Sequence, residues 1–230
     1  MKKFLIHKLV LIIFLPLRGF FFFNFFFFKI FPYFVRRKFI WNESNYKYSL
    51  IKKIGTYYKV NQFVETGTYL GDTSAALSSS FKKIYTVELN RELFKKTSKR
   101  LKKFKNIFCY NLSSDIFLKK IISKIKVKSI FFLDAHYSGP GTSKGNNFSC
   151  LEELYEIKKS KIKNHIIIID DISDFSAFEE NKNLSKIISV IEKISRNYKF
   201  YFDYDILFAI PDEKIHREFY KKIIPHFVIR

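Results

Sequence analysis

The segment VETGTYLGDTS, residues 64–74, decides the fold that this sequence predicts. It leads from a short apolar run into a helical pattern, with Glu65 near the end of the run and Gly67 and Gly71 around a tight turn. Glycine occurs only seven times in the 230 residues, so its placement here is informative. Because glycine has no Cβ, the backbone at Gly67 can approach a ligand closely. The segment is neither the GxGxxG dinucleotide fingerprint nor a phosphate-binding P-loop, which would need a lysine.

Outward from this turn, apolar strand-like runs alternate with helical patterns. The strands are predicted at Phe63–Val64, Ile84–Val87, Ile107–Tyr110, Ile130–Leu133 and Ile166–Ile169. The helices are predicted at Thr73–Ser80, Glu92–Phe104, Ile116–Ile125, Leu151–Lys158 and from Leu184 to Ile194. Short, almost wholly apolar strands that alternate with helices predict a parallel sheet covered on both faces. The segment Lys199–Ile210 predicts two closing strands that meet near Asp203–Asp205. The fold class is therefore α/β, a Rossmann-like, doubly wound and mostly parallel sheet with an antiparallel C-terminal edge hairpin.

Three regions are expected along the chain. Residues 1–38 form a hydrophobic, Phe-rich segment, residues 39–60 a connecting helix with Gly55 as its stop, and residues 61–230 the α/β domain. The connecting helix carries Leu50, Ile51 and Ile54 on one side. Length allows one sizeable domain with an appendage, because two full domains need a longer chain.

The N-terminal segment is too apolar for a solvent-exposed arm, and basic residues flank it at both ends. Pro16 and Gly19 interrupt it near the middle, so a clean transmembrane helix is not expected. We predict a membrane-associating segment, either an interfacial segment or a short, poorly formed hairpin, helical where it forms regular structure and with both ends on the cytoplasmic side. A packed helix that covers the domain is the alternative. The formal net charge of +21 predicts attraction to anionic surfaces, although a compositional bias toward AT-rich codons explains part of the excess.

A second acidic residue strengthens the functional interpretation of the turn. Glu88 ends the second strand, about 20 residues after the glycine turn, where a carboxylate can accept both hydroxyls of a ribose. Together the two features resemble class I S-adenosylmethionine-dependent methyltransferases, over about residues 60–210. The resemblance implies S-adenosylmethionine as cofactor. It implies the following cofactor-binding residues: Glu65, Gly67, Thr68, Gly71, Glu88, Ser113, Asp115 and Asp134.

Three aspartates follow the fourth and fifth strands. Asp134 ends one, Asp170 and Asp171 end the next, and parallel strands place these ends on the same rim. Carboxylates so close repel each other unless a cation or a proton intervenes, and oxygen ligands suit Mg²⁺ or Ca²⁺ rather than zinc. Capping of a helix or turn is the plainer interpretation of each single aspartate. The arrangement resembles metal-dependent sugar O-methyltransferases of the macrocin O-methyltransferase type, and also uncharacterised bacterial methyltransferase-like proteins. That resemblance implies Mg²⁺ held by Asp134, Asp170 and Asp171, with His136 as the catalytic base in place of the usual acid.

The sequence therefore predicts an enzyme, an S-adenosylmethionine-dependent O-methyltransferase that uses a divalent metal. Its partners are expected to be a small-molecule or glycan acceptor and a membrane surface. Without a helix-turn-helix, a zinc finger or an RNP motif, no specific nucleic acid is expected. The two cysteines form no CxxC pair, which favours a reducing compartment and hence the cytoplasmic face of the membrane, with the cytoplasm as the alternative. The alternative functions are a non-catalytic membrane-associated binding protein on this fold and a metal-independent methyltransferase. The oligomeric state is left open.

Overall fold

The computed structural model describes residues 33–134, 150–172, 184–203, 205–212 and 228–229, and the side chains of these residues from Asn45 onward except those of Asp203, Val228 and Ile229. Within these residues the strands form one eight-stranded sheet in the order β3-β2-β1-β4-β5-β7-β6-β8. Its strands are β1 (Gln62–Thr66), β2 (Lys83–Val87), β3 (Ile107–Tyr110), β4 (Ile130–Leu133), β5 (Ile166–Ile169), β6 (Tyr198–Asp203), β7 (Ile206–Pro211) and β8 (Val228–Ile229). Its helices are α3 (Tyr33–Tyr57), α4 (Asp72–Leu77), α5 (Arg91–Leu101), α6 (Ser114–Ile121), α7 (Cys150–Lys158) and α8 (Leu184–Glu192), with a 3₁₀ turn at Ile122–Lys124.

The pairing of the strands confirms the predicted topology. Strands β3, β2, β1, β4 and β5 are parallel, whereas β7, β6 and β8 are antiparallel. Strand order reverses between β1 and β4, because β1 leads on one side to β2 and on the other to β4. In open α/β sheets, ligands bind beyond the carboxyl ends of the strands at such a reversal. The fold therefore directs attention to the loops after β1, β2, β4 and β5.

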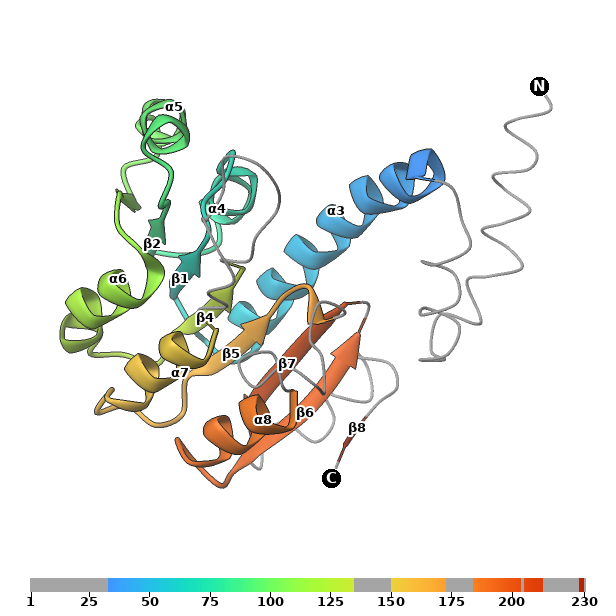
Figure 1. Ribbon diagram of the computed structural model, residues 1–230, viewed down its shortest axis with the longest axis vertical. Coiled ribbons are helices and arrows are strands. Elements are labelled where there is room, and N and C mark those ends of the chain that lie inside the picture. Colours follow the sequence, from blue (N-terminus) through green and yellow to red (C-terminus); the bar gives the residue numbers. More distant parts are fainter. Residues whose placement is uncertain (1–32, 135–149, 173–183, 204, 213–227, 230) are drawn as a thin grey trace.

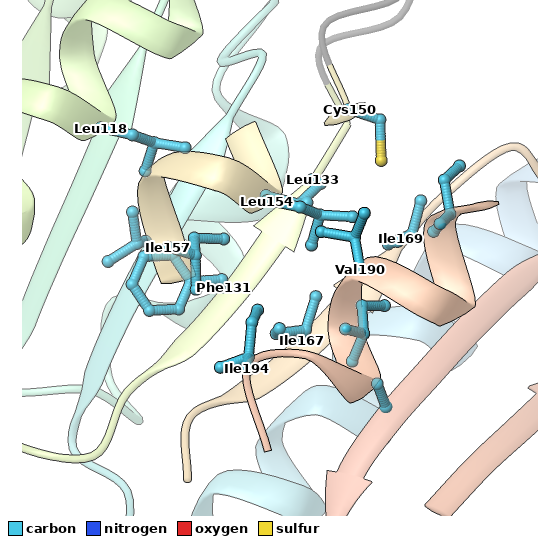
Figure 2. Close-up of a cluster of buried hydrophobic side chains, with 14 of the residues drawn as sticks. Leu118, Phe131, Leu133, Cys150, Leu154, Ile157, Ile167, Ile169, Val190 and Ile194 are labelled. Carbon is cyan, nitrogen blue, oxygen red and sulfur yellow. The ribbon is translucent and has the colours of Figure 1, made fainter. Parts of the chain in front are cut away.

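Helices cover both faces of the sheet (Figure 1). One apolar core lies between the sheet and helices α6, α7 and α8; Figure 2 shows Phe131, Leu133, Ile167 and Ile169 of the strands packed against these helices. The second core lies on the other face, under α3 and α4. Adjacent residues of one strand alternate between the two cores, as Phe131 and Phe132 do. This alternation is why the strands are apolar at nearly every position.

Helix α3 departs from the prediction at both ends. It begins at Tyr33, inside the predicted N-terminal segment of residues 1–38, and it continues through Gly55. Gly55 is not a stop, because a Cβ there would lie 2.8 Å from Cζ of Phe81, so this glycine lets the aromatic ring pack against the helix. The helix ends in a Schellman motif, in which Lys59 takes a left-handed conformation (φ 52°) and Val60 N donates to Gly55 O at 2.8 Å.

No described helix is long and apolar enough to cross a membrane. Residues 1–32, on which most of the membrane prediction falls, lie outside the described residues.

Candidate active site

The acidic residues after β4 and β5 meet at the carboxyl edge of the sheet. Leu133 pairs with Thr66 on one side and with Ile169 on the other, so the next residues, Asp134 and Asp170, occupy equivalent positions on neighbouring strands. The backbone continues the ladder past the strands, since Asp134 N donates to Thr66 O at 3.2 Å and Asp170 N donates to Leu133 O at 3.1 Å. The structure thus brings Asp134 and Asp170 together, as the sequence predicts.

Asp171 lies in the same electrostatic neighbourhood and has an unusual backbone. Its carboxylate acts on Asp134, whose pKa is well above the usual range because of burial and then because of the nearby carboxylates of Asp170 and Asp171. The φ of Asp171 is 52°, in the left-handed region that aspartate tolerates better than most residues. A carboxyl with a raised pKa beside other acids can hold a proton near neutral pH.

A lysine that the sequence analysis did not identify enters this cluster from helix α3. Nζ of Lys47 donates to Oδ2 of Asp170 in an ion pair whose side chains are only 18% and 4% exposed. Burial by itself lowers the pKa of Lys47, but the carboxylates of Asp170, Asp134 and Asp171 outweigh it and hold this pKa above its usual range. Lys47 is therefore charged, and it is the cation that neutralises part of the acidic edge.

The predicted Mg²⁺ site is not supported by this arrangement. Among the described residues no three histidine, cysteine, aspartate or glutamate side chains are placed to hold a metal ion together. An oxygen of Asp170 is already bound to the ammonium of Lys47, and a divalent cation beside that ammonium would be repelled. The donor set therefore does not fit the metal as long as Lys47 holds its place. His136, the predicted base, lies outside the described residues together with the rest of residues 135–149.

The glycine turn after β1 is held by backbone bonds to β2 and by the side chains of α5. Gly67, Tyr69 and Gly71 all have positive φ, of 84°, 45° and 78°. The N–H groups of Gly67 and Thr68 donate to Val87 O at 3.1 and 2.9 Å. A Cβ on Gly71 would lie 2.8 Å from Cγ2 of Thr97 in α5, so glycine is needed there for the helix to pack against the loop.

Glu88 closes the same loop from the second strand. Its two carboxylate oxygens accept from Tyr69 N at 2.8 Å and from Asn90 N at 2.9 Å, and the side chain is 7% exposed. A carboxylate has about four acceptor positions, so each oxygen can still accept a hydroxyl from a ligand. Leu89, the next residue in the chain, and Tyr69, whose N–H donates to this carboxylate, are 49% and 54% exposed. The edge beside Glu88 therefore combines an anchored acid with exposed apolar surface.

Glu65 takes a different position from the other predicted cofactor residues. It is 1% exposed, and its Oε2 accepts from Ser74 Oγ at 2.6 Å and from Thr86 Oγ1 at 2.7 Å. Thr68 joins the same network through a 2.6 Å contact between its Oγ1 and that of Thr86. Burial raises the pKa of Glu65 to about 7 in spite of these hydrogen bonds. Glu65 and Thr68 therefore shape the loop from beneath.

The loop after β3 carries the remaining predicted residues. Ser113 is the N-cap residue of α6, without a side-chain cap bond, and Asp115 stands in the first turn of that helix; both are partly exposed. Asn111, which the sequence analysis did not identify, donates from Nδ2 to Glu88 O at 2.7 Å and ties this loop to the second strand. The loops after β1, β2 and β3 thus form one connected edge.

No protein-family model matches the sequence, and no curated protein is similar enough to it to count as a relative. Solved structures do match the fold. The O-methyltransferase from Bacillus cereus in complex with SAH is 12% identical, with a TM-score of 0.53 over 74% of this chain and 81% of that one. The O-methyltransferase TomG from Streptomyces achromogenes, involved in tomaymycin synthesis and in complex with SAM, is 12% identical, with a TM-score of 0.51 over 73% of this chain and 80% of that one.

These likenesses define the class of fold. The chain has the Rossmann-like fold of S-adenosylmethionine-dependent methyltransferases, as the glycine turn and Glu88 predict. At 12% identity the likeness reaches no further than the fold. The resemblance to the macrocin type, the role of each site residue and the need for a metal stay predictions.

Proposed function

We propose that this protein transfers a methyl group from S-adenosylmethionine to an oxygen acceptor. The observation that carries the proposal is the join between the glycine turn and Glu88, in which a loop with three positive φ angles is fixed to an acid after the next strand. This join lies on the side of the β1–β4 reversal where α/β sheets bind ligands.

The residues at this edge fit the proposed cofactor by their chemistry. Glu88 keeps acceptor positions for two ribose hydroxyls, and the exposed Leu89 offers apolar surface for a purine. Gly67 lets the backbone approach the amino-acid part of the ligand, while Ser113 and Asp115 lie one strand further on. When bound, S-adenosylmethionine supplies an electrophilic methyl group on a positively charged sulfur.

The acceptor side of the reaction needs a group that takes a proton. We propose His136 for this role, two residues beyond Asp134, because a histidine titrates near neutral pH. The cluster of Asp134, Asp170 and Lys47 would orient the acceptor beside it. Metal assistance, which the sequence resemblance implies, is left out of this proposal because Lys47 is paired with Asp170.

We also propose where the protein works and on what. The acceptor is a small molecule or a sugar of a surface glycan, and the N-terminal segment attaches the protein to the cytoplasmic face of the membrane. The net charge of +21 supports attraction to anionic headgroups, and α5 presents exposed Lys95, Lys96 and Lys99. Recovery of the full chain in the membrane fraction, and its release when residues 1–41 are removed, would test this location.

The proposal is tested by calorimetric titration of the full chain with S-adenosylmethionine. The informative variant is Glu88→Gln, and the matched control is Glu92→Gln, the same exchange at a fully exposed site four residues on. Hydrogen bonds to a charged acceptor contribute about 1.5–3 kcal/mol, so Glu88→Gln is expected to weaken binding about tenfold or more. Equal affinities for the two variants, or no binding by the unmodified protein, would refute the proposed site.

A further inference from the structure

Lys47 reaches the acidic edge from the buried face of helix α3. It stands three, four and seven residues before Leu50, Ile51 and Ile54, so it lies on the helix face that packs into the core under the sheet. Those three residues are at most 3% exposed. A lysine at the end of such a stripe is not an ordinary surface residue, since its stem runs along the buried face and only its head has a polar partner.

The surroundings of the ammonium are partly apolar and strongly acidic. Besides its ion pair with Asp170, Nζ of Lys47 lies 5.6 Å from the ring centroid of Phe132 in β4. Asp170 is 3% exposed, so its carboxylate has left water almost completely. A buried carboxylate needs a compensating charge and a hydrogen bond. If its partner is removed, the uncompensated buried charge strongly lowers the stability of the fold. Among the described residues Lys47 provides the ion pair of Asp170.

We infer that the ammonium of Lys47 is the resident cation of this acidic edge, in the place where a divalent metal would otherwise be required. It holds the carboxylate of Asp170 in position next to Asp134, from a helix that lies before the whole α/β domain in sequence. Because the cation is covalently part of the chain, the edge keeps its charge balance in a chelator and binds no divalent ion while Lys47 is in place.

This inference concerns how the acidic edge is held and not which reaction takes place there. It therefore stands or fails separately from the proposed methyl transfer. Lys47 is a positioning residue in this account, since it acts on the site through Asp170.

The test is a titration of the full chain with Mn²⁺, in which the electron paramagnetic resonance signal of the free ion measures how much Mn²⁺ is bound. Lys47→Met removes the charge and keeps most of the stem, Lys47→Arg keeps the charge, and Lys53→Met is the matched control on the exposed side of the same helix. We expect Lys47→Met to bind Mn²⁺ at least about tenfold more tightly than the unmodified protein, since a fixed positive charge beside the ion is gone. Lys47→Arg and Lys53→Met should behave as the unmodified protein does. The gain should disappear in the double variant Lys47→Met/Asp170→Asn.

Two results would overturn the inference. One is tight Mn²⁺ binding by the unmodified protein that Asp170→Asn abolishes, a comparison that needs no Lys47 variant and so holds even if Lys47→Met does not fold. The other is a folded Lys47→Met protein that binds Mn²⁺ no more tightly than the unmodified chain. If Lys47→Met unfolds alone but regains its thermal transition in Mn²⁺, the inference is supported, because a merely structural role of the stem would not be rescued by an ion.

Discussion

The buried histidine before β5 makes the stability of the fold depend on pH in a way that can be measured. His165 is fully buried, at the end of the sheet opposite to the candidate site. Its Nδ1 accepts from Ser129 N at 3.1 Å, so the proton of the neutral ring is on Nε2, which lies 2.9 Å from Ser160 Oγ. Burial, and then the charges of Lys128 and Lys163, lower the pKa of His165 from 6.5 to about 4. The folded state therefore needs the neutral ring.

The size of the effect follows from the difference between the two pKa values. A depressed folded pKa means that the unfolded chain binds the proton more readily, so this contribution is complete above pH 6.5 and is lost as the pH falls toward 4. The difference corresponds to about 3 kcal/mol of unfolding free energy. His165→Asn removes the titration, and its cost in packing is the same at every pH. We expect the gap in unfolding free energy between the unmodified protein and His165→Asn to narrow by about 3 kcal/mol between pH 7.5 and pH 4.

Urea unfolding of both proteins at several pH values, followed by circular dichroism, measures this gap. A matched control is Tyr198→Phe, which removes the 2.7 Å hydrogen bond from the Tyr198 hydroxyl to the carbonyl of His165. Burial raises the pKa of Tyr198 far above this range, so the gap for Tyr198→Phe should be constant with pH. A gap for His165→Asn that is equally constant would show that the ring does not titrate as its surroundings imply.

Two further changes probe the loop that carries the candidate site. The pKa of Glu65 is raised in the folded state, so the unmodified protein loses stability as the pH rises from 4.5 through 7. Glu65→Gln should therefore gain up to about 3 kcal/mol of unfolding free energy relative to the unmodified chain over this range. Urea unfolding that gives the same difference between the two proteins at pH 4.5 and at pH 8 would contradict the assignment. Gly71→Ala should lower the free energy of unfolding by about 1–3 kcal/mol, since alanine must adopt a φ of 78° and its Cβ would meet Thr97 and Leu101. A thermal transition unchanged from that of the unmodified protein would show that the loop tolerates the side chain.

Much of the sheet could be predicted from sequence because its strands are short apolar runs with polar ends. Ile130–Leu133 and Ile166–Ile169 were predicted with their observed bounds, since Ser129 and His165 precede them and aspartates follow. Strand β8 could not be predicted, because two residues that pair with β6 carry no pattern of their own. The predicted helix stop at Gly55 is wrong, because glycine inside a helix and glycine after one cannot be told apart in sequence until Phe81 is placed against it.

Part of the candidate site could likewise be predicted from the sequence, and part could not. Asp134 and Asp170 could be brought together from sequence, because residues that follow neighbouring parallel strands share one edge. Lys47 could not, since one lysine among the 42 lysine and arginine residues gives no signal by its type. Its only signal in the sequence is the helical spacing that places it on the same face as Leu50 and Ile54. This spacing indicates that the side-chain stem is buried, but it does not indicate which carboxylate the ammonium reaches. The predicted metal site is not supported for this reason, because the three carboxylates are visible in the sequence whereas the lysine that pairs with Asp170 is not.

Helix α3 also fixes the distance between Tyr33 and the acidic edge. It runs without a break from Tyr33 to Tyr57, and Figure 1 shows its first turns extending beyond the sheet. At 1.5 Å per residue, Tyr33 lies about 20 Å along the helix axis from Lys47. Any surface that holds the chain at Tyr33 is therefore kept at a set separation from the acidic edge, because the helix between Tyr33 and Lys47 is continuous.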